Sequence, residues 1–278
     1  MDATSCSQQK LYNKLLNHYR RYRMIIFQYD HTFEGILSAL FDAYSRKTFP
    51  DLLLPEKEPL PLFYDSVFHV ITDNKKAERV WTALKKKLSR GALSQLTYCW
   101  LSEKPEAPLL LFNYMRKIVI APHSIETNFS DPDILAITQL GKKVSSEQHR
   151  VLQFMRFQKT YNGIYYGAMA PLYNVFPLTI SHFQNRFSDQ PWLIYDTKRK
   201  YGYYYDQNTV SEITFEFPEQ SHFTTGKLND SLLDIKEKLF QTLWKSYFDS
   251  ICIKERLNPI KHKKDMPVRF WKYLTEKQ

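Results

Sequence analysis

The sequence is short of glycine, cysteine and long apolar runs, and each shortage excludes a class of protein. Only 7 glycines occur in 278 residues, which argues against long flexible linkers. The three cysteines, Cys6, Cys99 and Cys252, are far apart and odd in number, so they predict a reduced protein without a disulfide framework. No apolar run reaches the ~18 residues of a membrane span, and the first residues lack the apolar stretch of a signal peptide. We therefore expect a cytoplasmic protein that enters no membrane.

The motifs of several common kinds of site are also absent. No two histidines have the spacing of a zinc-binding pair, and there is no C-x-x-C or cysteine triple for an iron–sulfur cluster. G-x-G-x-x-G, G-x-x-x-x-G-K-[ST] and G-x-S-x-G do not occur. The sequence therefore predicts no metal and no cofactor, while a site assembled from distant residues stays open.

What the chain does have is positive charge at both ends. Its net charge is +10, from 39 Lys and Arg against 29 Asp and Glu. Residues 1–23 carry a charge of +4 and residues 254–278 a charge of +5, so the long body between them is close to neutral. Two cationic arms on a near-neutral body are common in proteins that meet a polyanion. The alternative is that the basic ends only keep the chain soluble.

Apolar periodicity predicts a strand followed by a helix at the start of the body. Met24–Gln28 is a short apolar run typical of a strand. Apolar residues then recur at helical spacing over 33–44, and either Asp30 or Thr32 can cap that helix. Residues 50–61 contain four prolines and are expected to form a loop. The remaining expectations for the first half are a strand at Val67–Thr72 and helices near 75–90, 93–101, 105–118 and 131–140.

The second half alternates strand-like and helical segments. Asn162-Gly163 between two strand-like runs predicts a hairpin, because both residues tolerate positive φ. Further strands are expected at Trp192–Tyr195, Tyr201–Tyr205 and Val210–Phe217, and helices at Pro177–Phe187 and Leu228–Ile253. The predicted fold class is α+β: an opening βα unit, a helical middle, a small antiparallel sheet with flanking helices, a C-terminal helix and a basic tail. We expect one domain over 1–253, or two tightly packed halves of about 1–143 and 144–253, followed by a basic aromatic arm at 254–278.

A catalytic pocket could be assembled from scattered polar residues. Its candidates are His149, Arg156, His182, Asp196 and Asp30, because histidine and carboxylate side chains supply general acid and base chemistry. Three of these candidates also have a structural explanation: a helix cap for Asp30, a structural histidine for His149 and a place at the edge of the core for Arg156.

Nucleic-acid contacts are expected from cations and from tyrosines on a strand. The candidate phosphate contacts are Lys75, Lys76, Arg79, Lys85, Lys86, Lys87 and Arg90 on the predicted basic helix, and Lys261, Lys263, Lys264, Arg269 and Lys272 in the tail. Tyr203 and Tyr205 lie on one face of a strand and could stack on bases. The alternatives are a solvated helix face and tyrosines that pack against neighbouring strands.

Three groups of residues, in order along the chain, resemble a known family. The first is Tyr29-Asp30-x-Thr32-Phe33-Glu34-Gly35-Ile36-Leu37. The second is His149, then Phe154-x-Arg156-Phe157, His182-Phe183-x-x-Arg186-Phe187 and Trp192-x-Ile194-x-Asp196. The third is Pro267-x-Arg269-Phe270-Trp271-Lys272-Tyr273-Leu274-Thr275-Glu276. Over about residues 23–276 the chain resembles bacterial DNA-metabolism proteins that accompany a radical-SAM protein of DNA repair. The same region is found attached to some proteins of the uracil-DNA glycosylase type.

The resemblance implies a setting in DNA repair and a radical-SAM partner, but no reaction. Together with the charge, it favours an accessory nucleic-acid-binding protein of DNA metabolism, acting on single- or double-stranded DNA. One alternative is an enzyme that acts on DNA or a nucleotide through the His/Asp/Arg pocket. Another is an interaction subunit that docks on its partner through Phe270, Trp271 and Tyr273 in the tail, unless the tail folds back on its own core.

Overall fold

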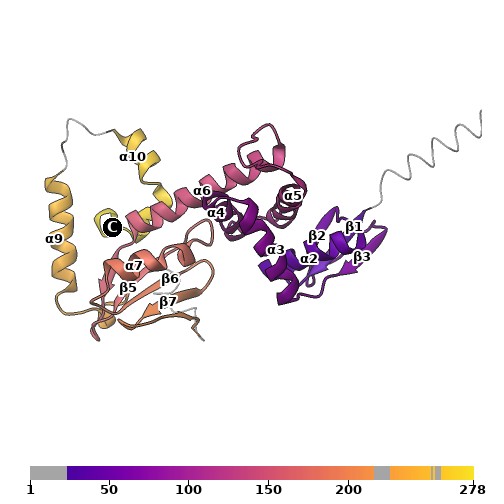
Figure 1. The fold of residues 1–278 in the computed structure, drawn as a ribbon. Coiled ribbons are helices and arrows are strands. Elements are labelled where there is room, and N and C mark those ends of the chain that lie inside the picture. The colour runs from indigo at the N-terminus through magenta and orange to yellow at the C-terminus, as the bar shows by residue number, and fades with distance from the viewer. Residues whose placement is uncertain (1–23, 216–225, 252, 254–257) are drawn as a thin grey trace, which may run out of the picture. The chain divides into compact units, whose positions relative to one another are not determined.

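The chain folds into two units, each with its own sheet and helices (Figure 1). The computed structural model describes residues 24–215, 226–251, 253 and 258–278. The first unit is Met1–Gly141 and the second is Lys142–Gln278, with the boundary inside helix α6 (Pro132–Phe154). The predicted α+β class is confirmed. None of the described helices is long and apolar enough to cross a membrane.

A three-stranded parallel sheet opens the first unit. Its strands are β1 (Ile25–Tyr29), β2 (Leu52–Pro55) and β3 (Ser66–His69), in the order β2-β1-β3. The expected loop over 50–61 is wrong in part, because β2 forms there as an edge strand. Pro55 is compatible with that strand because it stands at its end, on the edge of the sheet. Parallel neighbours need a crossover, and α2 (Phe33–Arg46) provides the one between β1 and β2.

Among the described residues of the first unit, four helices and the start of α6 build the rest of the fold. The helices after α2 are α3 (Asn74–Lys87), α4 (Arg90–Leu101) and α5 (Ala107–Ile120). Fully buried side chains come from every layer: Phe27 of β1, Leu84 of α3 and Phe112 of α5. The apolar stripe of each helix therefore faces one shared core, as its 3.6-residue period predicts.

The second unit contains a five-stranded mixed sheet. Its strands, in spatial order, are β4 (Phe157–Lys159), β5 (Tyr165–Met169), β6 (Trp192–Asp196), β7 (Tyr201–Tyr205) and β8 (Val210–Ile213). The β4–β5 hairpin is confirmed, with Gly163 in its turn at φ +85°. The expectation of an antiparallel sheet is wrong for one pair, since β5 and β6 run parallel. The helical segment between them, η1 (Phe176–Leu178) and α7 (Ile180–Arg186), supplies the crossover that parallel strands require.

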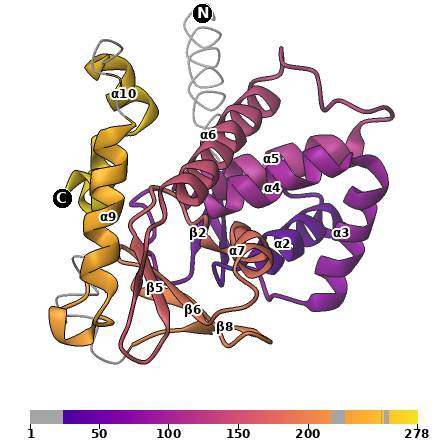
Figure 2. The same ribbon diagram turned by 90° about the vertical axis from the view of Figure 1, so that its left-hand side faces the viewer.

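The C-terminal part of the chain belongs to the second unit. The expected helix over Leu228–Ile253 begins later: η2 (Asp230–Leu232) comes first, and α9 spans Glu237–Ser250. Figure 2 shows α9 as a separate rod beside the strands. The described part of the arm forms α10 (Pro259–Asp265), η4 (Val268–Tyr273) and η5 (Thr275–Lys277). Residues 1–23 and 254–257 of the two basic ends lie outside the described residues.

Candidate functional site

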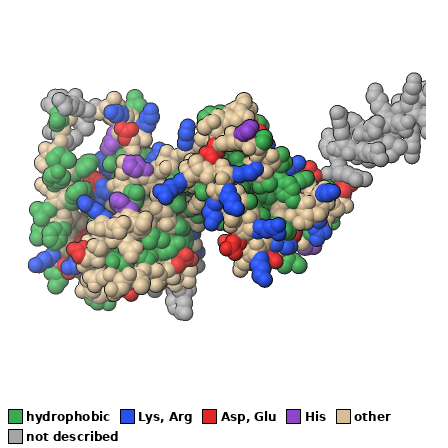
Figure 3. All heavy atoms as spheres, viewed as in Figure 1, with side chains coloured by type: hydrophobic (Ala, Val, Ile, Leu, Met, Phe, Trp, Pro, Cys, Tyr) green, Lys and Arg blue, Asp and Glu red, His purple; other side chains and the backbone are tan. Residues whose placement is uncertain are grey.

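Exposed cations gather on the outer face of α3, in the described part of the first unit. The helix carries six lysines and arginines against Glu78 alone, and the Asp73 carboxylate caps its N-terminus by accepting from Lys75 N at 2.8 Å. Lys75, Arg79 and Lys86 line a shallow depression of about 510 Å³ together with Glu78, Thr82 and Ala83. Figure 3 shows Lys and Arg side chains gathered over this region. The face can receive an extended anion.

Most of the cations on this face have no acidic partner in the described part of the chain. Within the described residues, no ion pair joins Lys75, Arg79, Lys85 or Lys86 of α3, or Arg90 of α4, to a carboxylate. Their side chains are exposed, so solvent balances their charge. We call Lys75, Arg79, Lys85 and Lys86 the α3 cationic face. Charges of this kind can exchange small counterions for phosphates at little desolvation cost.

Two lysines of α3 have structural roles instead. The Nζ of Lys76 lies 2.8 Å from Asp42 Oδ1 of α2. The Nζ of Lys87 donates to the backbone oxygens of Ile118, Val119 and Ala121, at 3.2, 2.7 and 2.9 Å. These carbonyls end α5 and would otherwise lack partners, since the last turn of a helix leaves its C=O groups free. The sequence does not separate these two lysines from their neighbours, because their partners are more than 30 residues away.

The cations of the C-terminal arm also divide into exposed ones and one with a structural role. Lys261, Lys263 and Lys264 of α10 are exposed, as is Lys272. Arg269 makes a two-pronged contact with the buried carboxylate of Glu147 in α6, at 2.8 and 2.5 Å. The carboxylate also accepts from the backbone N–H of Leu172. Arg269 therefore anchors the arm to α6 and is not placed to contact a phosphate.

The aromatic candidates of the strand and arm lie mostly in the core. Tyr203 and Tyr205 are 8% and 4% exposed. Their hydroxyl groups donate to the Glu212 carboxylate and to the backbone oxygen of Gln207. The structure assigns both rings to packing between strands, which leaves no ring face for a base. Tyr205 packs on Trp192 of β6, with ring centroids 5.3 Å apart, and Tyr203 contacts the ring of Tyr201 at 5.6 Å.

The three arm aromatics proposed to meet a partner are also engaged within the second unit. Phe270 is fully buried against Phe154, with ring centroids 5.4 Å apart, and Tyr273 is 6% exposed. The indole N–H of Trp271 donates to the backbone oxygen of Met266. The arm thus packs on its own unit, the alternative that the sequence left open.

Asp30 organises the turn between β1 and α2. Its Oδ1 accepts from the backbone N–H of Thr32 at 3.1 Å and from the Thr32 hydroxyl at 2.6 Å. Thr32 itself caps α2 by accepting from Gly35 N. A Cβ on Gly35 would collide with the Asp30 carboxylate, so this position requires glycine. Burial would raise the pKa of Asp30, but the hydrogen bonds from Thr32 outweigh it and hold the pKa below its usual range. Asp30 is thus an ionised carboxylate with a structural role.

The other catalytic candidates have separate environments in the second unit. His149 is exposed and its ring contacts the Gln153 amide at 2.9 Å, and His182 is also exposed. Asp196 is buried, accepts from two backbone N–H groups in the turn after β6 and pairs with Arg199 at 2.8 Å. These contacts account for each side chain locally and give the enzymatic hypothesis no common site.

Arg156 belongs to a polar clamp that joins three segments. Its guanidinium donates to Glu276 of η5 at 2.7 Å, and the indole N–H of Trp244 in α9 donates to the same carboxylate at 2.9 Å. Burial would raise the pKa of Glu276, but these hydrogen bonds outweigh it and hold the pKa below its usual range. The Arg156–Glu276–Trp244 clamp therefore fixes α9 against the C-terminal segment.

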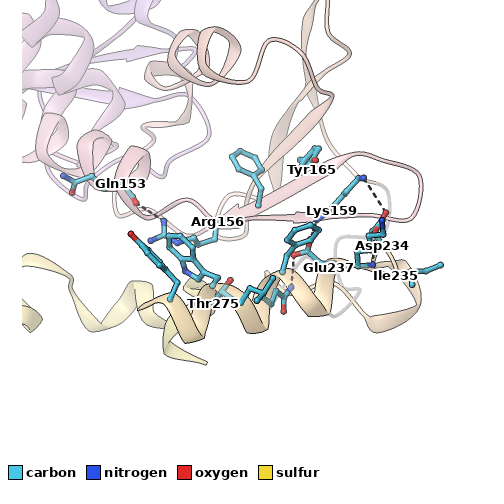
Figure 4. A pocket seen from close by; sticks show the side chains of 15 residues that line it. Gln153, Arg156, Lys159, Tyr165, Asp234, Ile235, Glu237 and Thr275 are labelled. Atoms are coloured by element: carbon cyan, nitrogen blue, oxygen red, sulfur yellow. Dashed lines mark hydrogen bonds and ion pairs between the residues drawn. The ribbon is translucent and has the colours of Figure 1, made fainter. Parts of the chain in front are cut away.

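Beside this clamp runs an open groove of about 1360 Å³ between α9 and the β4–β5 hairpin. Figure 4 shows its side chains, with Arg156 and Thr275 at one end and the Lys159–Asp234 pair at the other. The aromatic lining is Phe157, Tyr165, Phe240, Trp244 and Tyr247. Among the five predicted catalytic residues, Arg156 lines this groove and the other four do not. The groove itself was not predicted from the sequence. Periodicity marks the apolar positions of α9, but it does not show which of these side chains are left exposed in the folded chain.

The fold and these surfaces define an α+β protein with an exposed cationic helix and an open apolar groove. A family model described as a domain of unknown function, DUF4130, matches residues 105–276. The match covers more than half of the chain, so the protein belongs to this family. It begins just before α5 and ends with Glu276, and thus includes the clamp and the Arg269–Glu147 pair. No curated protein and no solved structure matches the chain.

Proposed function

We propose that this protein is an accessory nucleic-acid-binding protein of DNA metabolism and that the α3 cationic face holds the phosphates. The observation that carries the proposal is the separation of cations on one helix. Lys76 and Lys87 are bound to protein groups, whereas Lys75, Arg79, Lys85 and Lys86 face solvent without a carboxylate partner among the described residues. A face that only served solubility would not need this concentration of one sign.

The spacing of these cations suits a nucleic-acid backbone. Lys75, Arg79 and Lys86 follow each other at four and seven residues, which keeps them on one side of the helix. At 1.5 Å per residue they span ~17 Å, the length of about five base steps at 3.4 Å each. The exposed lysines of α10, Lys261, Lys263 and Lys264, offer further phosphate contacts in the second unit.

The contacts are electrostatic, so the proposal concerns backbone binding rather than reading of a base sequence. The resemblance to DNA-metabolism proteins supports DNA as the polyanion and a radical-SAM protein as the partner that would supply the chemistry.

The test is the salt dependence of binding to fluorescent single-stranded and duplex DNA. We expect affinity to fall steeply with salt, and the slope of log K against log salt to lose about one unit per cation replaced in Lys75→Gln, Arg79→Gln and Lys86→Gln. Lys76→Gln and Lys87→Gln remove the same charge from the same helix and are the matched controls. Absence of binding at low salt, or equal loss in the variants and the controls, would refute the proposal.

A further inference from the structure

The exposed side of α9 carries an unusual amount of apolar surface. Ile235 before the helix is 99% exposed, and Leu243 and Tyr247 are each 54% exposed. The other large side chains that α9 and the next residue expose are Leu239, Phe240, Trp244 and Ile251. Figure 3 shows hydrophobic side chains gathered along the side of the molecule where α9 lies. We call Leu239, Phe240, Leu243, Trp244, Tyr247 and Ile251 the α9 apolar face.

This face has the pattern of a helix–helix contact. Phe240, Leu243, Tyr247 and Ile251 recur at i, i+3, i+7 and i+11, which places them along one seam of the helix. On or beside the seam, Ser246 and Ser250 are small and uncharged, so another helix can approach closely. The polar contacts of α9 come from residues outside the seam: the Glu237 carboxylate accepts from Lys159 N, and the Trp244 indole N–H donates to Glu276.

The size of the face exceeds what a free surface usually shows. Large side chains present on the order of 200 Å² each when free, so six of them at about half exposure leave roughly 600 Å² of mainly apolar surface. That is the upper end of the largest patch on a typical monomer, ~300–600 Å². Two such faces together would bury roughly 1,200 Å², the lower bound for a stable, specific interface.

The charge around the face excludes a strongly charged partner. Within α9, Glu237 and Asp249 balance Lys238 and Lys245. In the adjoining groove, Lys159 pairs with Asp234 at 3.6 Å, as Arg156 does with Glu276. Lys236 adds one further cation to the groove lining, so an acidic protein or a nucleic-acid backbone would find little excess positive charge here. A second copy needs none, because a neutral apolar face is complementary to itself across a two-fold axis.

From the size, the seam and the neutrality of this surface, we infer that a second copy of this chain covers the α9 apolar face, so that the protein is a homodimer through α9. The contact is isologous, with the two helices side by side and the same residues buried on both copies. It also covers the open side of the groove. The α3 cationic face is not part of it, so dimerisation and nucleic-acid binding are separate properties of the chain.

Sedimentation velocity of the full chain over a range of concentrations tests the inference. The wild type is expected to reach twice the chain mass of 33.2 kDa. Leu243→Glu and Tyr247→Glu, at two half-exposed positions, are each expected to return it to 33.2 kDa. Lys245→Gln lowers the net charge by the same amount on the opposite side of α9 and is expected to stay dimeric. Far-UV circular dichroism establishes that each variant is folded.

Two outcomes overturn the inference. One is a wild type of 33.2 kDa at every concentration, and the other is a dimer that neither Leu243→Glu nor Tyr247→Glu dissociates. Binding of single-stranded DNA is measured on the same samples. A monomeric wild type whose DNA binding is lost in Leu243→Glu would overturn the dimer and assign the groove to nucleic acid. A dimer that fails to bind DNA would leave the inference intact and refute the proposed function instead.

Discussion

Two helices of equal length, α3 and α9, expose opposite kinds of surface. Each has 14 residues, but α3 buries Ala77, Val80 and Leu84 and turns its cations outward. In α9 the buried residue is Glu237, and the leucines and aromatics face outward. The first helix is held by apolar packing and the second mainly by the hydrogen bonds of Glu237 and Trp244. The difference shows that an amphipathic pattern defines two faces of a helix and leaves open which of them is inside.

The two modes of attachment have different energetic consequences. Burying apolar surface stabilises by ~25 cal/mol per Å², so α3 is a firm platform on which its cations keep fixed positions. A helix held mainly by polar contacts has little buried apolar area, and such segments open with lower free energy than the core does. A partner on the α9 apolar face would supply the missing burial.

The largest expected effect is a difference in unfolding free energy between a leucine substitution in α3 and one in α9. Leu84→Ala empties a fully buried site and should cost about 4 kcal/mol of unfolding free energy, the usual cost of such cavities. Leu239→Ala, at a side chain that is 58% exposed, should cost less than about 1 kcal/mol. Urea unfolding at low protein concentration, where association does not contribute, measures both. Equal costs would mean that the α9 leucines are buried within the monomer.

The next effect concerns a cation with a structural role. Arg269→Ala leaves the buried Glu147 carboxylate without its main partner and should cost about 3 kcal/mol, as removal of one member of a buried pair usually does. Lys264→Ala, at an exposed lysine of α10, should change the stability by less than about 0.5 kcal/mol. Thermal unfolding followed by circular dichroism compares the two. A mild effect of Arg269→Ala would show that the arm is anchored mainly by its buried side chains, such as Phe270 and Tyr273.

The sequence was sufficient for the elements whose determinants are local. The apolar stripe and N-cap of α2, the basic helix α3 and the Asn162-Gly163 hairpin depend on residues within one or two turns of each other. The strand β2 was missed because three leucines among four prolines are too short a signal, and its pairing with β1 decides it.

The candidate sites depended on distant partners. Which cations are free was set by Asp42, Glu147 and the carbonyls that end α5, up to 122 residues away. Local patterns therefore predicted the basic helix as a candidate but could not separate Lys86 from Lys87. They also could not show that Tyr203 and Tyr205 are buried within the second unit, where Tyr205 packs on Trp192.

A smaller effect is expected in the polar clamp of α9, and it depends on pH. Since the folded-state pKa of Glu276 lies below its unfolded value, its stabilisation is present above the unfolded pKa of ~4.3 and is lost as the pH falls through the lowered value. Glu276→Gln should cost about 2 kcal/mol at neutral pH, and the difference from the wild type should shrink in acid. Urea unfolding of both proteins across this range measures it. A difference that is independent of pH would assign the effect to packing rather than to the carboxylate charge.

The smallest effect distinguishes two neighbouring lysines of α3. Lys87→Gln removes the ammonium group that binds the carbonyls of Val119 and Ala121, so it should cost about 0.5–1 kcal/mol, the usual value of a cation at a helix C-terminus. Lys86→Gln removes an equal charge that contacts solvent, so it should leave the stability unchanged and weaken DNA binding. The two substitutions alter the net charge identically. Urea unfolding and a salt titration of DNA binding are therefore measured on both variants, and each variant is expected to change the result of one measurement more than the other. If the two variants behaved alike in both measurements, the division of α3 into structural and phosphate-binding cations would fail, and only its total charge would matter.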